Sequence, residues 1–169
     1  QVCLAGSRLY VQRGIYDEFV DRFVDAAEAL VIGNPREETT QLGPLASAEH
    51  YKKVRGYVEE VQSGAGRMAT GGFGEGWVVR PTVVLDAPLD SRVVCEEVFG
   101  PVVTVHPFDT EGDAVALAND TPYGLNAMVF TENLSRAHRM SARLKAGTVW
   151  VNCFFIRAQG RRHAGLSGP

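Results

Sequence analysis

Cys3 is the first residue of the sequence that could act as a nucleophile. It lies in the segment QVCLAGSR at residues 1–8, among small and weakly polar residues. The thiolate is the reactive form of cysteine, and a position at the mouth of a sheet would bring backbone N–H groups close to it. On residue type alone, a lone cysteine among small apolar residues is more often a buried structural residue. The segment therefore allows two interpretations, a nucleophile or a buried thiol.

A second group of chemically capable side chains lies in the segment EEVFGP at residues 96–101. The carboxylates of Glu96 and Glu97 could bind a ligand or be a solvated pair, and Phe99 could line a site or belong to the core. The segment precedes a run of β-branched residues, so we expect it to be extended. If Glu96 acted as a base, Glu97 would have to point the opposite way along the chain.

The three cysteines favour neither a disulfide framework nor a metal site. Cys3, Cys95 and Cys153 are odd in number and far apart, and the sequence contains no C-x-x-C pair. Structural zinc sites and disulfide scaffolds both need closely matched cysteine spacings. We therefore predict no metal ion, and we expect Cys153 to be buried at the end of a strand.

Strands and helices alternate in the elements that would position these residues. Strands are expected at residues 7–11, 78–85, 102–106, 126–130 and 147–151, and helices at residues 15–27, 47–62, 109–119 and 135–144. Ser47 is suited to cap the second helix, and the glycines between residues 64 and 76 predict hairpin turns. The alternation predicts one α/β domain over residues 1–169, with a mainly parallel sheet covered by helices.

The composition excludes several classes of protein. Hydrophobic residues make up 45% and charged residues 22% of the chain, as in ordinary globular domains. The net charge of -3, from 17 basic and 20 acidic residues, provides no basic surface for nucleic acid. No apolar stretch approaches the ~18 residues of a membrane span, and the cysteine usage fits a reducing compartment. We therefore expect a cytoplasmic protein without nucleic-acid or membrane partners.

Four short motifs occur in order along the chain. They are QVCLAGSR at residues 1–8, EEVFGP at 96–101, TPYGL at 121–125 and GTVWVN at 147–152. In this order and at these separations they resemble the NAD(P)-dependent aldehyde dehydrogenase superfamily. The resemblance extends over residues 1–157 and corresponds to the catalytic domain of that family from its nucleophile onward. It implies that the Rossmann-like cofactor domain, which precedes this part in the family, is absent from the chain.

The resemblance implies roles for individual residues. Cys3 matches the cysteine that attacks the aldehyde carbon, Glu97 the glutamate that hydrogen-bonds the nicotinamide ribose, and Phe99 the aromatic residue that packs at the same ribose. The implied reaction oxidises an aldehyde to a carboxylic acid through a thiohemiacetal and a thioester, with NAD as cofactor and NADP as the alternative. Lys53 matches a position where the family often has a second ribose contact, but an exposed helical lysine is the simpler interpretation.

The segment NCFFIR at residues 152–157 is similar to the branch of the family that oxidises 2-hydroxymuconic semialdehyde and related aldehydes of aromatic-compound degradation. There Arg157 would bind the distal carboxylate of the substrate, because a guanidinium pairs with a carboxylate in bidentate geometry. A structural ion pair is the alternative role. Residues 158–163 depart from the family pattern and are two residues short of it, which a local reading-frame slip would explain.

The resemblance also predicts what the isolated chain cannot do. The general-base glutamate and the oxyanion-hole asparagine of the family come from residues that would precede Gln1, so we expect the isolated fragment to be inactive. The parent enzyme is expected to be a homo-oligomer that acts on a small-molecule aldehyde. One alternative is a non-catalytic binding or assembly module derived from the same domain. Another is a cysteine hydrolase, in which Cys3 would pair with one of four histidines, His50, His106, His138 or His163.

Overall fold

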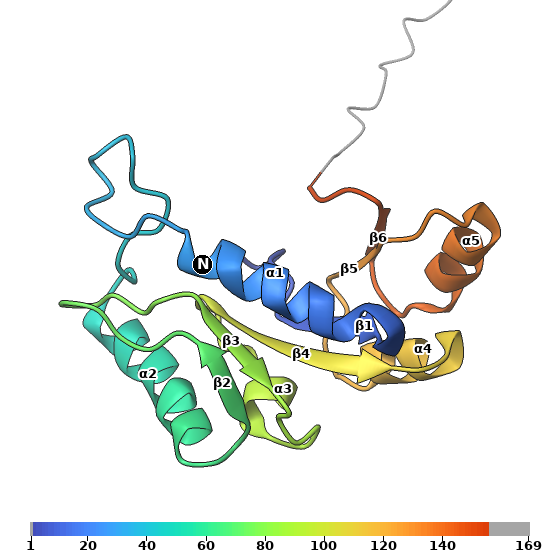
Figure 1. Cartoon of the computed structure of the whole chain (residues 1–169), viewed down its shortest axis with the longest axis horizontal. Helices are drawn as coiled ribbons and strands as arrows, with labels where there is room; N and C mark the ends of the chain where they lie inside the picture. Colours follow the sequence, from blue (N-terminus) through green and yellow to red (C-terminus); the bar gives the residue numbers. More distant parts are fainter. Residues whose placement is uncertain (1, 156–169) are drawn as a thin grey trace, which may run out of the picture.

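The structure, a computed structural model, describes residues 2–155. Its helices are η1 (Arg13–Ile15, a 3₁₀ turn), α1 (Tyr16–Glu28), α2 (Ala48–Gln62), α3 (Arg92–Cys95), α4 (Glu111–Asn119) and α5 (Leu134–Arg143). Its strands are β1 (Arg8–Gln12), β2 (Arg67–Thr70), β3 (Thr82–Leu85), β4 (Val102–Phe108), β5 (Asn126–Val129) and β6 (Thr148–Val151). Helix α2 lies at one end of the molecule, and α4 and α5 lie at the other (Figure 1). Between residues 2 and 155, each helix is too short or too polar to span a bilayer.

The strands form two sheets. The larger one has the order β1-β4-β3-β2, in which β1 and β3 pair in parallel with β4, and β2 pairs antiparallel with β3. Strands β5 and β6 pair in parallel in a separate two-stranded sheet. The predicted α/β fold with mainly parallel strands is thus confirmed, although the strands are divided between two sheets.

Hydrophobic clusters cover both faces of the four-stranded sheet. Successive side chains of a strand point to opposite faces, so Val83 and Val84 of β3 belong to different clusters. Val83 packs in the cluster that contains Val20 of α1. Val84 packs in the cluster that contains Val54 of α2 and Val93 of α3. Helix α1 therefore covers one face, while α2 and α3 cover the other and reach the segment that precedes β4.

Two of the predicted helices begin at well-formed caps. The Ser47 hydroxyl accepts a hydrogen bond from the backbone N–H of His50 at 3.1 Å, which confirms the predicted cap of α2. Thr110 and Asp113 form a reciprocal capping box at the start of α4. Such caps satisfy backbone N–H groups that have no partner inside the helix. The start of α2 is therefore set by its own sequence.

The prediction between residues 64 and 85 was partly wrong. The glycine-rich stretch does form a hairpin, but it contains the strand β2, which the glycines obscured. The strand expected at residues 78–85 begins only at Thr82, because Pro81 has no N–H to donate to a ladder. Gly71, at the turn after β2, has a φ of +136° and approaches Thr82 so closely that a Cβ atom would lie 2.4 Å from its hydroxyl oxygen. The one-turn helix α3 was not predicted.

Candidate functional site

Cys3 and the segment 96–101 lie before neighbouring parallel strands. The Cys3 segment leads into β1 and the 96–101 segment leads into β4, with Arg8 opposite Thr104 in the register. The backbone N–H of Thr104 also donates to the Ser7 carbonyl at 2.9 Å, which extends the pairing toward Cys3. Because parallel strands begin at the same edge of a sheet, the structure places both predicted site segments at one edge.

Cys3 is exposed on a tight turn rather than buried. The turn is closed by a hydrogen bond from the Ala5 N–H to the Val2 carbonyl at 3.0 Å. The neighbouring Leu4 is 9% exposed and anchors the turn in the protein. The interpretation of Cys3 as a buried structural thiol is therefore wrong, and its sulfur is accessible to a reactant.

The residues that follow Cys3 hold its turn in place from two directions. An ideal Cβ at Gly6 would lie 3.1 Å from the terminal methyl of Met128, so the chain passes close to β5 at this point. The Arg8 guanidinium donates to the backbone carbonyls of Leu117, Ala118 and Asp120 at 3.5, 3.2 and 3.4 Å. These carbonyls lie at the C-terminal end of α4. A cation there hydrogen-bonds carbonyls that have no partner within the helix, and it interacts favourably with the helix dipole. Arg8 thus ties the start of β1 to α4.

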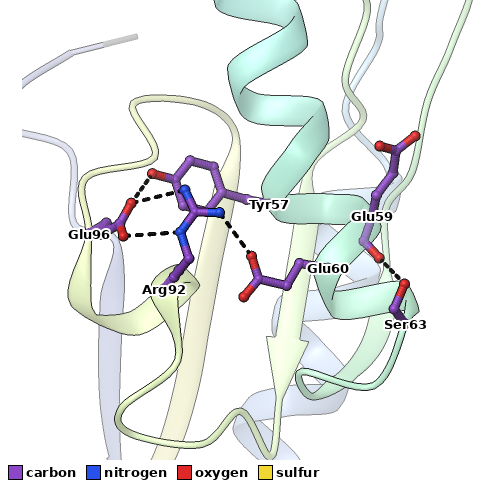
Figure 2. Close-up of polar contacts among 6 residues, drawn as sticks. All are labelled: Tyr57, Glu59, Glu60, Ser63, Arg92 and Glu96. Atoms are coloured by element: carbon purple, nitrogen blue, oxygen red, sulfur yellow. Dashed lines mark hydrogen bonds and ion pairs between the residues drawn. The ribbon is translucent and has the colours of Figure 1, made fainter.

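Glu96 and Glu97 differ sharply in their surroundings. The Glu96 carboxylate accepts a hydrogen bond from the Tyr57 hydroxyl at 2.6 Å and two from Arg92 at 3.0 and 3.2 Å (Figure 2). Arg92 also reaches Glu60 at 3.3 Å and lies over the Tyr57 ring, 4.8 Å from its centroid. The Arg92 guanidinium, with the Tyr57 hydroxyl, holds the pKa of the Glu96 carboxyl below its usual range. Glu96 is therefore committed to structural contacts and is a poor base.

Glu97 keeps its carboxylate available. Its side chain is exposed and makes no hydrogen bond or ion pair with any residue that the structure describes. Its backbone is held instead, because the Lys53 ammonium donates to the Glu97 carbonyl at 2.9 Å. The exposed helical lysine of the sequence interpretation thus has a specific contact with the predicted cofactor segment.

Phe99 has an unusual backbone conformation. Its φ is +60°, a region that non-glycine residues rarely adopt, so the expectation of an extended segment is wrong at this residue. The His50 ring N–H donates to the Phe99 carbonyl at 2.8 Å, and the two rings meet edge to face with centroids 5.9 Å apart. The Phe99 side chain is 37% exposed, which excludes the core interpretation and leaves the ring accessible to a ligand.

The other predicted residues contribute less to this site. Arg157 lies outside the described residues, as does the altered segment 158–163. Cys153 is half-buried just after β6. Asn152 has a structural function, since its side-chain amide exchanges two hydrogen bonds of 2.8 Å with the backbone of Thr131.

No histidine of the described part forms a hydrogen bond with Cys3. His50 is bonded to Phe99, His106 is buried in β4, and His138 is exposed on α5. His163 lies outside the described residues. Between residues 2 and 155, no group of three His, Cys, Asp or Glu side chains is placed to hold a metal ion. The described geometry supports neither a cysteine–histidine pair nor a metal centre.

Sequence reasoning missed the part that α2 plays in the site. His50, Lys53 and Tyr57 are spaced by three and four residues, so they share one face of the helix, and each contacts the segment 96–100. The helical spacing of these polar residues was visible in the sequence. Their common partner, about forty to fifty residues away, was not.

Known proteins share both the sequence and the fold of this chain. Residues 1–167 match the aldehyde dehydrogenase family. The chain is 46% identical over 166 residues to a 2-hydroxymuconic semialdehyde dehydrogenase of Pseudomonas sp. strain CF600, covering 93% of this chain and 34% of that protein. It is 43% identical over 157 residues to a betaine aldehyde dehydrogenase of Cereibacter sphaeroides, covering 91% and 32%.

A solved structure of a betaine aldehyde dehydrogenase is similar to this chain in fold as well as in sequence. The crystal structure of a betaine aldehyde dehydrogenase from Staphylococcus aureus in complex with NAD+ superposes with a TM-score of 0.88 at 39% identity, covering 92% of this chain and 32% of that one. The chain thus spans about a third of the length of the relatives that it matches.

Proposed function

Because the chain belongs to the aldehyde dehydrogenase family, we propose that it forms part of an enzyme that oxidises an aldehyde to a carboxylic acid with NAD+, or alternatively NADP+. The observation that supports this most directly is the sheet edge shared by Cys3 and the 96–101 segment. It combines an exposed thiol with an accessible aromatic ring and a carboxylate that has no partner among residues 2–155. We assign the nucleophile to Cys3.

The chemistry follows from the properties of sulfur. The Cys3 thiolate adds to the aldehyde carbon and forms a C–S bond, and the backbone N–H of Cys3 helps to hold the resulting oxyanion. When held by Glu97 and Phe99, a dinucleotide would supply the hydride acceptor for the oxidation of this thiohemiacetal to a thioester on Cys3. Water then adds to the thioester carbon, the C–S bond breaks, and the acid leaves while Cys3 regains its thiol. A thioester is activated for this hydrolysis, whereas a serine ester would react more slowly.

The residues before β4 are suited to the nicotinamide end of the cofactor. The Glu97 carboxylate, which has no partner within the described part of the chain, can accept hydrogen bonds from both ribose hydroxyls. The exposed face of Phe99 provides an apolar contact for the same sugar and ring. We therefore assign cofactor binding to Glu97 and Phe99.

The substrate we propose is a muconic-type semialdehyde. The assignment depends on Arg157, whose guanidinium would bind the distal carboxylate of such a substrate. Relatives that act on a muconic semialdehyde and on betaine aldehyde are almost equally similar to the chain. An assay of the full-length enzyme on 2-hydroxymuconic semialdehyde, which carries a carboxylate, and on benzaldehyde, which does not, before and after Arg157→Ala, tests this role of Arg157. Loss on the semialdehyde alone supports the assignment, and equal loss on both contradicts it.

Replacement of each cysteine tests the proposed reaction. In the full-length enzyme, Cys3→Ala is expected to abolish aldehyde oxidation, because the proposed covalent intermediate forms on the Cys3 sulfur. Cys95→Ala and Cys153→Ala are the matched controls and should keep near-normal activity. Retained oxidation in Cys3→Ala would end the assignment. A polypeptide of residues 1–169 expressed by itself is proposed to be inactive, since the family takes its general base from elsewhere in the enzyme, a loss of about 10²–10⁴ in rate.

The second candidate is a non-catalytic assembly module, which exposed apolar side chains would favour. Phe130 and Leu134 are 71% and 72% exposed, and both follow β5. A full-length protein that assembles through this surface but oxidises no aldehyde would support the module. Oxidation that depends on Cys3 would exclude it, and a homo-oligomer would then be a property of the enzyme.

A further inference from the structure

Glu96 and Glu97, which precede β4, differ in their contacts. We propose that Glu96 is a positioning residue, held by Tyr57 and Arg92, that fixes the chain so that the Glu97 carboxylate faces the cofactor. This inference rests on the proposed function of Glu97 as a ribose contact. Glu96 itself would touch neither substrate nor cofactor.

The side chain of Glu96 is 45% exposed, and its partners link it to the core of the domain. Both carboxylate oxygens are used, one by the Arg92 Nε–H at 3.0 Å and the other by the Tyr57 hydroxyl at 2.6 Å and a second Arg92 N–H at 3.2 Å. Tyr57 is 3% exposed and packs in the core cluster of α2, so its hydroxyl is a rigid donor. Hydrogen bonds to an ionised group are about twice as strong as neutral ones. Glu96 is thus anchored to the core of the domain.

The backbone conformation at Glu96 determines the direction of the Glu97 side chain. Glu96 ends α3 with φ of -106° and ψ of 161°, which is extended geometry. Neighbouring side chains point to opposite sides of an extended chain. Because the Glu96 side chain is directed to Tyr57 and Arg92, the Glu97 side chain must point away from them, and it is exposed and unpaired within the described residues.

Helix α2 also holds the residues that follow Glu96. Tyr57 contacts Glu96, Lys53 holds the Glu97 carbonyl, and His50 holds the Phe99 carbonyl, so the segment runs antiparallel to the helix. Of these three hydrogen bonds, only that of Tyr57 ends on a side chain of the segment. Loss of that contact would leave Glu96 held by Arg92 alone and loosen the chain just before Glu97, while the contacts at its other end remain.

Cys3 is independent of this arrangement. Its turn is held by β1 pairing with β4 and by Arg8 at the end of α4, and not by Tyr57, Arg92 or Glu96. A defect at Glu96 should therefore weaken cofactor binding without changing the nucleophile. This separation allows the two roles to be measured apart.

The test uses Tyr57→Phe and Glu96→Gln in the full-length enzyme, with Glu60→Gln as the control. Tyr57→Phe keeps the ring over which Arg92 lies, and Glu96→Gln keeps an oxygen that Tyr57 can bond. Glu60 contacts the same Arg92 but belongs to α2. We expect both test variants to raise the Kd and the KM for NAD+ about fivefold and Glu60→Gln to leave them within about twofold. The KM for aldehyde and the rate of Cys3 alkylation by iodoacetamide should stay unchanged in all three.

The outcomes are distinct. If Tyr57→Phe and Glu96→Gln lower the Tm but leave the Kd for NAD+ unchanged in the folded enzyme, Glu96 is merely structural and the proposal is overturned. If Glu60→Gln raises the Kd for NAD+ as much as Glu96→Gln does, the charge of Arg92 alone explains the effect, and the proposal is likewise overturned. Failure of the proposed function would show elsewhere, as aldehyde oxidation that survives Cys3→Ala.

Discussion

Gly100 lies against the buried side of α2, and its replacement by alanine should overpack this contact. A Cβ atom at Gly100 would lie 2.8 Å from Val54 Cγ1 and 3.0 Å from Val54 Cγ2. Val54 is 0% exposed, and a β-branched side chain in a helix has one strongly preferred rotamer, so its methyl groups cannot turn away. Overpacking costs about 1–3 kcal/mol, and the reduced entropy of the unfolded alanine chain offsets about 0.4–1 kcal/mol. We expect Gly100→Ala to lower the free energy of unfolding by about 1–2 kcal/mol.

Urea unfolding followed by circular dichroism measures this loss, and the chain offers a matched control. Gly56 lies within α2, and apart from its chain neighbours and the helix backbone no atom of the described residues is within 4 Å of its Cβ position, so Gly56→Ala should raise stability by about 0.5–1 kcal/mol. Val54→Ala removes both obstructing methyl groups, so the double variant with Gly100→Ala should show a coupling energy of about 1 kcal/mol in a double-mutant cycle. Wild-type stability in Gly100→Ala, or strict additivity in the cycle, would refute the proposed contact between α2 and the segment before β4.

Two further predictions concern stability against pH. Burial, with repulsion from Arg8, lowers the pKa of His106 in the folded protein. As the pH falls, the imidazole is therefore protonated in the unfolded chain before it is protonated in the folded one. The free energy of unfolding should decrease as the pH drops below about 6.5. His106→Leu should flatten this part of a urea-unfolding profile between pH 8 and 5, and an unchanged slope would contradict the reasoning. Hydrogen bonds from Arg139 and Arg136 lower the pKa of Glu111 to about 2, so its stabilising effect should be present above about pH 4.3 and lost as the pH falls toward 2. Glu111→Gln should lower the Tm at pH 7, by less in about 1 M NaCl, and a decrease that salt does not reduce would exclude the ion pairs as its cause.

Much of the secondary structure could be predicted because its causes are local. The helix at residues 47–62 has its cap at Ser47 and its apolar stripe within one stretch of chain, and the structure confirms both. The β-branched run before His106 predicted β4 in the same way. Strand β2 was missed because flanking glycines hide a four-residue strand that pairing with β3 stabilises.

The sequence by itself determined the family, the α/β class and the candidate residues Cys3, Glu97 and Phe99, since motifs and periodicities are properties of short segments. Only the tertiary structure decided which of two adjacent glutamates has a side-chain partner among the residues that the structure describes. That choice depends on Tyr57 and Arg92, and Tyr57 lies 39 residues away in the chain. It also showed the Cys3 thiol to be exposed. Burial and long-range hydrogen bonds arise when helices pack on the sheet, and local sequence cannot specify which distant groups will meet there.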